Sequence, residues 1–152
     1  MLVKYHIFIG FIFSIILFLI FHNITLIGAG IIFFSSFLID FDHYIYYIIK
    51  KKDTNLINSI NYFLRRRKDV KNMSIKERKK FYSGFCFLHG IEILIILFIA
   101  GIFISKYFLL IFIGFALHLA LDIIEEVYNN ARVDKISIIY DWFKFKKLKQ
   151  LR

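Results

Sequence analysis

Only one cysteine occurs in the 152-residue chain. A single cysteine, Cys86, excludes an internal disulfide, and it also excludes a paired-cysteine metal site. We interpret Cys86 as a small apolar residue of a helix. The sequence offers no other thiol chemistry.

Lysine and arginine are missing from four long apolar runs, although the chain carries a net charge of +10 and is 59% hydrophobic. A soluble domain of this length is usually nearer half apolar. The basic residues crowd into the segments between the runs. This distribution argues against nucleic acid as a partner and is typical of a membrane protein.

Each apolar run is close to the roughly 20 residues that a membrane-spanning helix needs. The turns around His22 and Ser105 are short, which predicts two antiparallel helix hairpins. We expect an all-α, polytopic membrane protein with a four-helix transmembrane domain over 1–128, a basic loop over 50–84 and a basic amphipathic tail over 129–152. The predicted spans are 5–21, 24–49, 85–104 and 107–128.

The distribution of basic residues also predicts the orientation. With both termini in the cytoplasm, 20 of the 21 lysines and arginines lie inside, and only Lys106 lies outside. We therefore expect a multi-pass protein of the cell membrane whose loop and tail rest on the lipid surface. The run from Arg65 to Lys68 is expected to contact anionic lipid. Ser74 and Glu77 have the spacing of a capping box.

Acids and histidines within the spans are the informative residues. An acid at the centre of a span costs roughly 2.5–3.5 kcal/mol on the insertion scale. Protonation, a water-filled cavity or a bound cation would each offset that cost, and the nearby histidines favour the cation. In the predicted topology the candidates share one side of the membrane. The candidate metal ligands are His6, Asp40, His43, His89, His118 and Asp122.

Helical spacing refines this hypothesis. His118 and Asp122 are four residues apart and share a face, and His89 and Glu92 are three apart. Asp42 lies well around the helix from Asp40, so either the helix is distorted or Asp42 has an outer role. Imidazole and carboxylate ligands suit zinc, manganese or iron, with zinc as our expectation. Asp42 or Glu92 is predicted to act as general base.

The pattern resembles the membrane-bound metal-dependent hydrolases, a group that includes a LexA-regulated inner-membrane type. Matching features are His6 near the start, the segment 39–43 (IDFDH), His89 opening the third span, and the spacing of Gly114, His118 and Asp122. The chain departs from the family where an earlier histidine of the third motif is missing. The resemblance implies a metal-dependent hydrolase.

We therefore expect a membrane-embedded hydrolase in which a metal-activated water attacks a phosphoester or lipid-like substrate at the cytoplasmic interface. Lys79 and Lys80 are expected to attract an anionic substrate. Two alternatives stay open. One is an ion or proton transporter, since intramembrane acids and histidines also build such paths. The other is a non-catalytic membrane subunit with a structural metal site.

Overall fold

The computed structural model describes residues 3–78, 81–82, 86–128 and 136–150. These residues are helical apart from turns, connecting loops and a two-residue parallel pairing between β1 (Phe81–Tyr82) and β2 (Lys149–Gln150). The helices are α1 (Val3–Ile20), α2 (Leu26–Leu38), α3 (Phe41–Lys51), α4 (Leu56–Asn72), α5 (Ile75–Arg78), α6 (Ile91–Phe103), α7 (Lys106–Tyr128) and α8 (Ile138–Lys147).

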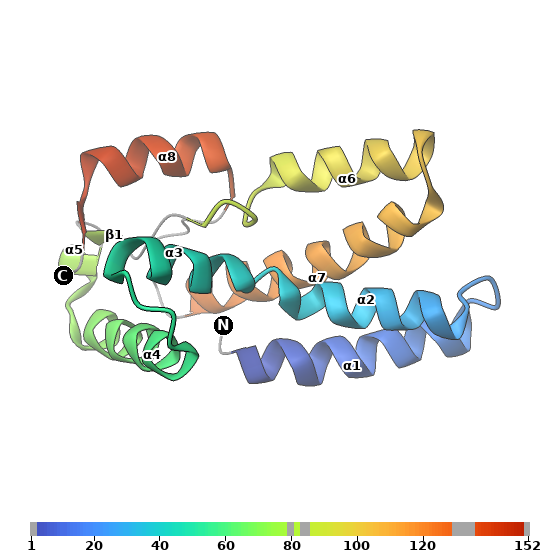
Figure 1. Cartoon of the computed structure of the whole chain (residues 1–152), viewed down its shortest axis with the longest axis horizontal. Helices are drawn as coiled ribbons and strands as arrows, with labels where there is room; N and C mark the ends of the chain where they lie inside the picture. The colour runs from blue at the N-terminus through green and yellow to red at the C-terminus, as the bar shows by residue number, and fades with distance from the viewer. Residues whose placement is uncertain (1–2, 79–80, 83–85, 129–135, 151–152) are drawn as a thin grey trace.

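The long apolar helices form the centre of the fold. α2 packs against both α1 and α7, and α6 packs against α7 on its other side (Figure 1). α3 continues beyond the end of α2, and α4 turns back to contact α3 (Figure 1). The helices α1, α2 and α7 therefore enclose the space in which polar side chains meet.

A tightened turn separates α2 from α3. Three backbone N–H groups in this turn, those of Asp40, Asp42 and His43, each donate to the carbonyl three residues earlier, at 3.1–3.3 Å. Bonds of this kind wind the backbone more tightly than an α-helix does, so side chains after the turn are rotated relative to those before it. The backbone is therefore distorted near Asp42, which is one of the two alternatives left open for this residue.

Two glycines allow the helices to approach closely. A Cβ atom added to Gly10 of α1 would lie 2.9 Å from Cβ of Ser36, and one added to Gly114 of α7 would lie 2.6 Å from the carbonyl oxygen of Ile32. Small residues of this kind let helix backbones pack at short range. Gly10 is one turn from His6, and Gly114 is one turn from His118, so these contacts position both histidines.

Within the described residues, three helical segments are long and apolar enough to span a membrane: Val3–Ile20, Leu26–Lys51 and Lys106–Tyr128. The fourth, α6, is apolar but has only 13 residues, which is about 20 Å of helix. The predicted third span began at residue 85, whereas helix starts only at Ile91. Residues 86–90 are non-helical, Gly90 is the N-cap of α6, and the backbone N–H of Leu88 bonds to the side chain of Asp42.

The basic loop and the tail form short helices with exposed apolar faces. The capping box predicted for α5 is confirmed, since Oε2 of Glu77 accepts from the backbone N–H of Ser74 at 2.9 Å and Oγ of Ser74 accepts from that of Glu77. Exposed apolar side chains on α4 and α8 are Leu56, Ile57, Ile60, Leu64, Ile139, Tyr140, Trp142 and Phe143.

Candidate metal centre

Five side chains from separate parts of the chain meet between α1, α2 and α7, four of them almost fully buried and that of Asp40 8% exposed. We call them the buried cluster: His6, Asp40, His89, His118 and Asp122. His6 comes from α1, Asp40 from the turn after α2, and His89 from the loop before α6, while the other two come from α7. All five were predicted as metal ligands, and the structure brings them together.

The hydrogen bond of His89 fixes which ring nitrogen carries its proton. Nδ1 of His89 lies 2.9 Å from Oδ2 of Asp42, and the same oxygen accepts the backbone N–H of Leu88 at 3.0 Å. A carboxylate is an acceptor only, so Nδ1 of His89 is the donor. In the neutral ring the lone pair is then on Nε2. Asp42 thus takes an outer position. It orients His89 through Nδ1, while Nε2 of the same ring faces His118.

His118 has the same arrangement with a different acceptor. Its Nδ1 lies 2.8 Å from the carbonyl oxygen of Ser36, which can only accept a hydrogen bond. Nδ1 therefore carries the proton, and Nε2 of the neutral ring has the lone pair. Metal-binding histidines are commonly oriented by a hydrogen bond of this kind from the other ring nitrogen.

Four acceptor atoms consequently face one another. Nε2 of His89 lies 3.1 Å from Nε2 of His118. Oδ1 of Asp40 and Oδ2 of Asp122 each lie 3.5–3.6 Å from both nitrogens. A proton can join only two of these atoms, whereas one cation can bind at least three of them, as in the group of Asp40, His89 and His118.

The spacing of these atoms suits a small divalent ion. A tetrahedral ion with bonds of about 2.0–2.1 Å holds its ligands about 3.3–3.4 Å apart. The separations that involve the two Nε2 atoms, from 3.1 to 3.6 Å, bracket that value. Two imidazoles and two carboxylates form a donor set typical of zinc, manganese or iron. The residues present therefore fit a metal ion.

His6 completes the cluster from α1. Its ring stacks on that of His118, with centroids 3.9 Å apart, and its Nε2 lies 3.2 Å from Oδ1 of Asp122. The side chain is fully buried. Neither ring nitrogen has hydrogen-bond geometry to any partner within the described residues, which suits a ligand or a close neighbour of an ion.

His43 and Cys86 lie beside the buried cluster. Nε2 of His43 is 3.4 Å from Oδ1 of Asp40, and its Nδ1 is 3.0 Å from Sγ of Cys86. His43 is the most exposed of the predicted ligands, with a quarter of its side chain accessible. Sequence reasoning missed the position of Cys86, because a lone cysteine has no spacing that links it to a histidine 43 residues away.

Glu92 lies apart from these residues. Its carboxylate accepts the hydroxyl of Ser137 at 2.6 Å and the backbone N–H of Ile138 at 2.9 Å, so it caps the start of α8. We expected Glu92 to share a helix face with His89. That inference was wrong, because α6 begins at Ile91 and His89 precedes it.

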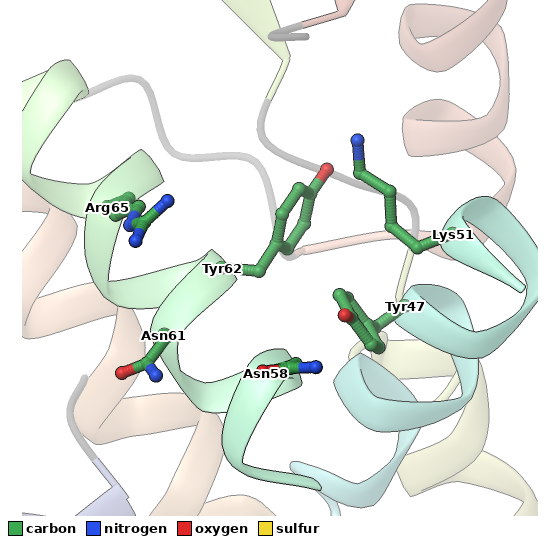
Figure 2. A pocket seen from close by; sticks show the side chains of 6 residues that line it. All are labelled: Tyr47, Lys51, Asn58, Asn61, Tyr62 and Arg65. Atoms are coloured by element: carbon green, nitrogen blue, oxygen red, sulfur yellow. The ribbon is translucent and has the colours of Figure 1, made fainter. Parts of the chain in front are cut away.

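A separate polar pocket of about 330 Å³ lies between α3 and α4. Figure 2 shows its lining side chains: Tyr47, Lys51, Asn58, Asn61, Tyr62 and Arg65. Two of these residues bond to Asp53, which accepts hydrogen bonds from the hydroxyl of Tyr47 at 2.5 Å and the amide of Asn58 at 2.9 Å. The pocket contains two basic side chains and no histidine.

Arg67 of α4 forms an ion pair with Glu125 of α7, so one residue of the basic run contacts protein. Lys79 and Lys80, expected to attract a substrate, lie outside the described residues.

Comparison with protein-family models, with curated proteins and with solved structures finds no match to the chain.

Proposed function

We propose that the chain is a multi-pass membrane protein that binds a divalent metal ion in the buried cluster and uses it for hydrolysis. The observation that carries the proposal is the convergence of four acceptor atoms from His89, His118, Asp40 and Asp122. Burying so many acceptors without a cation would be costly. Zinc is the ion we favour.

Membrane insertion is supported by the outer surface of the helices. α1 and α6 expose many large apolar side chains, among them Phe8, Phe11, Leu19, Ile96, Ile102 and Phe103. Such faces are compatible with lipid and not with water. In the proposed topology the four apolar segments form two antiparallel hairpins, and both termini, the loop and the tail are cytoplasmic. The buried cluster then lies toward the cytoplasmic side.

The proposed chemistry divides the work among these residues. An ion held in the buried cluster would lower the pKa of a bound water toward about 7, which supplies a nucleophile for hydrolysis at neutral pH. Asp42 is a positioning residue, since its carboxylate orients His89. The contacts of Glu92 lie with α8, so this proposal gives it no proton-transfer role.

An anionic phosphoester, such as a lipid headgroup, is the substrate class we propose. Lys51 and Arg65 line the pocket between α3 and α4, and basic side chains there would attract a negatively charged group from the lipid surface. Partial exposure of His43 leaves one side of the site approachable. Substrate would thus reach the ion from the membrane boundary.

Metal content tests the proposal. The purified protein is expected to contain at least one zinc, manganese or iron ion per chain by elemental analysis. His118→Ala and Asp122→Ala should lose that ion, whereas His22→Ala, which changes an exposed histidine in the turn after α1, should keep it. Absence of bound metal from the unsubstituted protein would refute the proposal.

A second assay separates hydrolysis from the alternatives. Protein reconstituted in vesicles should cleave a chromogenic phosphodiester, lose activity with a chelator and regain it with zinc or manganese. Metal binding without activity would indicate a structural site. Cation flux would favour transport, but the buried serines of α1 and α2, Ser14, Ser35 and Ser36, bond to their own helix backbones rather than extending a polar path.

A further inference from the structure

We propose that Cys86, His43 and Asp42 form a second cation site, next to the buried cluster, that takes a thiophilic divalent ion such as zinc. This site adjoins the proposed metal centre, and its position rests on that proposal. Together with His89, these residues each offer one ligand atom within 4.8 Å of the others. Sγ of Cys86 lies 3.0 Å from Nδ1 of His43, and Cys86 is buried.

The carboxylate of Asp42 provides independent support. Its Oδ2 accepts hydrogen bonds from His89 and Leu88. Its Oδ1 is also buried but has no hydrogen-bond partner within the part of the chain that the structure describes. A buried carboxylate oxygen without a donor is expensive. A cation between this carboxylate, the thiol and the imidazole would remove that cost.

The donor set distinguishes the two sites. A thiolate with an imidazole and a carboxylate favours zinc and other thiophilic ions over manganese or magnesium. The buried cluster has no sulfur ligand. Asp40 lies between the sites, since its Oδ1 is 3.4 Å from His43 and 3.5 Å from His118. Two adjacent ions are a common arrangement in enzymes that cleave phosphoesters.

The non-helical loop before α6 brings Cys86 next to His43. The backbone N–H of Leu88 is anchored on Asp42, and this contact holds residues 86–90 against the turn between α2 and α3. Cys86 and His43 are then neighbours although 43 residues separate them. The same loop therefore contributes Cys86 to one site and His89 to the other.

Cobalt substitution tests the second site directly. Full-length protein in detergent, stripped of metal and loaded with Co²⁺, should bind two ions per chain and show a thiolate-to-cobalt charge-transfer band in the near ultraviolet. Cys86→Ser should lose the band and bind one ion. His118→Ala should keep the band while losing the other ion, so failure of one site is distinguished from failure of the other.

A measurement on the unsubstituted protein covers the case in which a variant does not fold. Because Cys86 is the only cysteine, maleimide labelling reports on it alone. Zinc at about ten times its dissociation constant should slow the labelling roughly tenfold, and the same protection should appear in His118→Ala. Cobalt bound without a thiolate band, or labelling unaffected by zinc, would overturn the second site.

Discussion

The carboxylate of Asp42 lies behind the ring of His89, with Oδ2 2.9 Å from Nδ1. Asp42→Asn should weaken metal binding at the buried cluster by about 10–100-fold, because loss of such an orienting carboxylate lowers the basicity of the ligand. Titration with a fluorescent zinc chelator, in a Cys86→Ser background that lacks the second site, measures the change. The control is Asp53→Asn, which alters a carboxylate outside the cluster. Unchanged affinity in Asp42→Asn would show that His89 is not a ligand.

Close packing of α7 on α2 is tested at Gly114. Gly114→Ala should destabilise the protein by about 1–3 kcal/mol, because the new Cβ would press on the backbone carbonyl of Ile32, which cannot move aside. Gly30→Ala is the matched control, since a Cβ there meets nothing within 4 Å. Thermal unfolding in detergent compares the two. Equal stability in both variants would contradict the close approach.

Glu92 should stabilise the start of α8 in the tail rather than bind metal. Glu92→Ala removes the acceptor for Ser137 and Ile138, so amide exchange in α8 should become faster while metal content stays the same. Hydrogen–deuterium exchange and elemental analysis of one sample measure both. Ser137→Ala should give a weaker form of the same effect. Loss of metal from Glu92→Ala with α8 intact would restore Glu92 as a site residue.

The ion pair between Arg67 and Glu125 joins the basic loop to α7. Both side chains are about one quarter exposed, so solvent screens the attraction and a double-mutant cycle should give a coupling energy of only about 0.5 kcal/mol. Arg67→Gln, Glu125→Gln and the double variant, compared by thermal unfolding at low and high salt, supply the cycle. A coupling that does not fall with salt would contradict this account.

Acid should loosen the turn between α3 and α4. The hydroxyl of Tyr47, the backbone N–H of Asn55 and the amide of Asn58 donate to Asp53 and lower the pKa of its carboxyl below the ordinary 3.8. A lowered folded pKa means that this stabilisation is complete above pH 3.8 and is lost as the pH falls through the folded value. Proteolysis of the turn across this range measures the loss.

Tyr47→Phe is the companion variant. It removes the largest cause of the lowered pKa of Asp53, so the acid transition should move to higher pH. Tyr44→Phe is a matched control, because the hydroxyl of Tyr44 bonds to the backbone carbonyl of Thr54 and not to Asp53. The same shift in both variants would show that Tyr47 has no special effect on Asp53.

Much of the candidate site could be predicted from sequence, because the position of a residue along a predicted span sets its distance from the predicted membrane face. Residues near the same predicted membrane face, such as His6 and Asp122, meet in the structure. The spacing of His118 and Asp122 was sufficient to predict that they share a helix face, because both lie on α7. Both open alternatives for Asp42 hold, since the backbone is tightened and the side chain has an outer position.

The loop before α6 could not be predicted in the same way. Residues 86–90 lead directly into α6, and Gly90 at the N-cap is the local mark of where this helix starts. The tertiary hydrogen bond from Leu88 to Asp42 in this loop has no counterpart in the sequence pattern. For the same reason, the roles of Cys86 and Glu92 depended on a backbone path that spacing alone did not reveal.

Ser35 and Ser36 are consecutive on α2, yet they contact glycines of different neighbours, Gly114 and Gly10. A slide of either neighbour by one residue would displace its histidine by about 1.5 Å along the helix, whereas metal–ligand distances tolerate only about 0.2 Å. The contacts of Gly10 and Gly114 that align His6 and His118 thus lie one helical turn away from these histidines. Substitutions at these small residues should change ion selectivity before they unfold the protein.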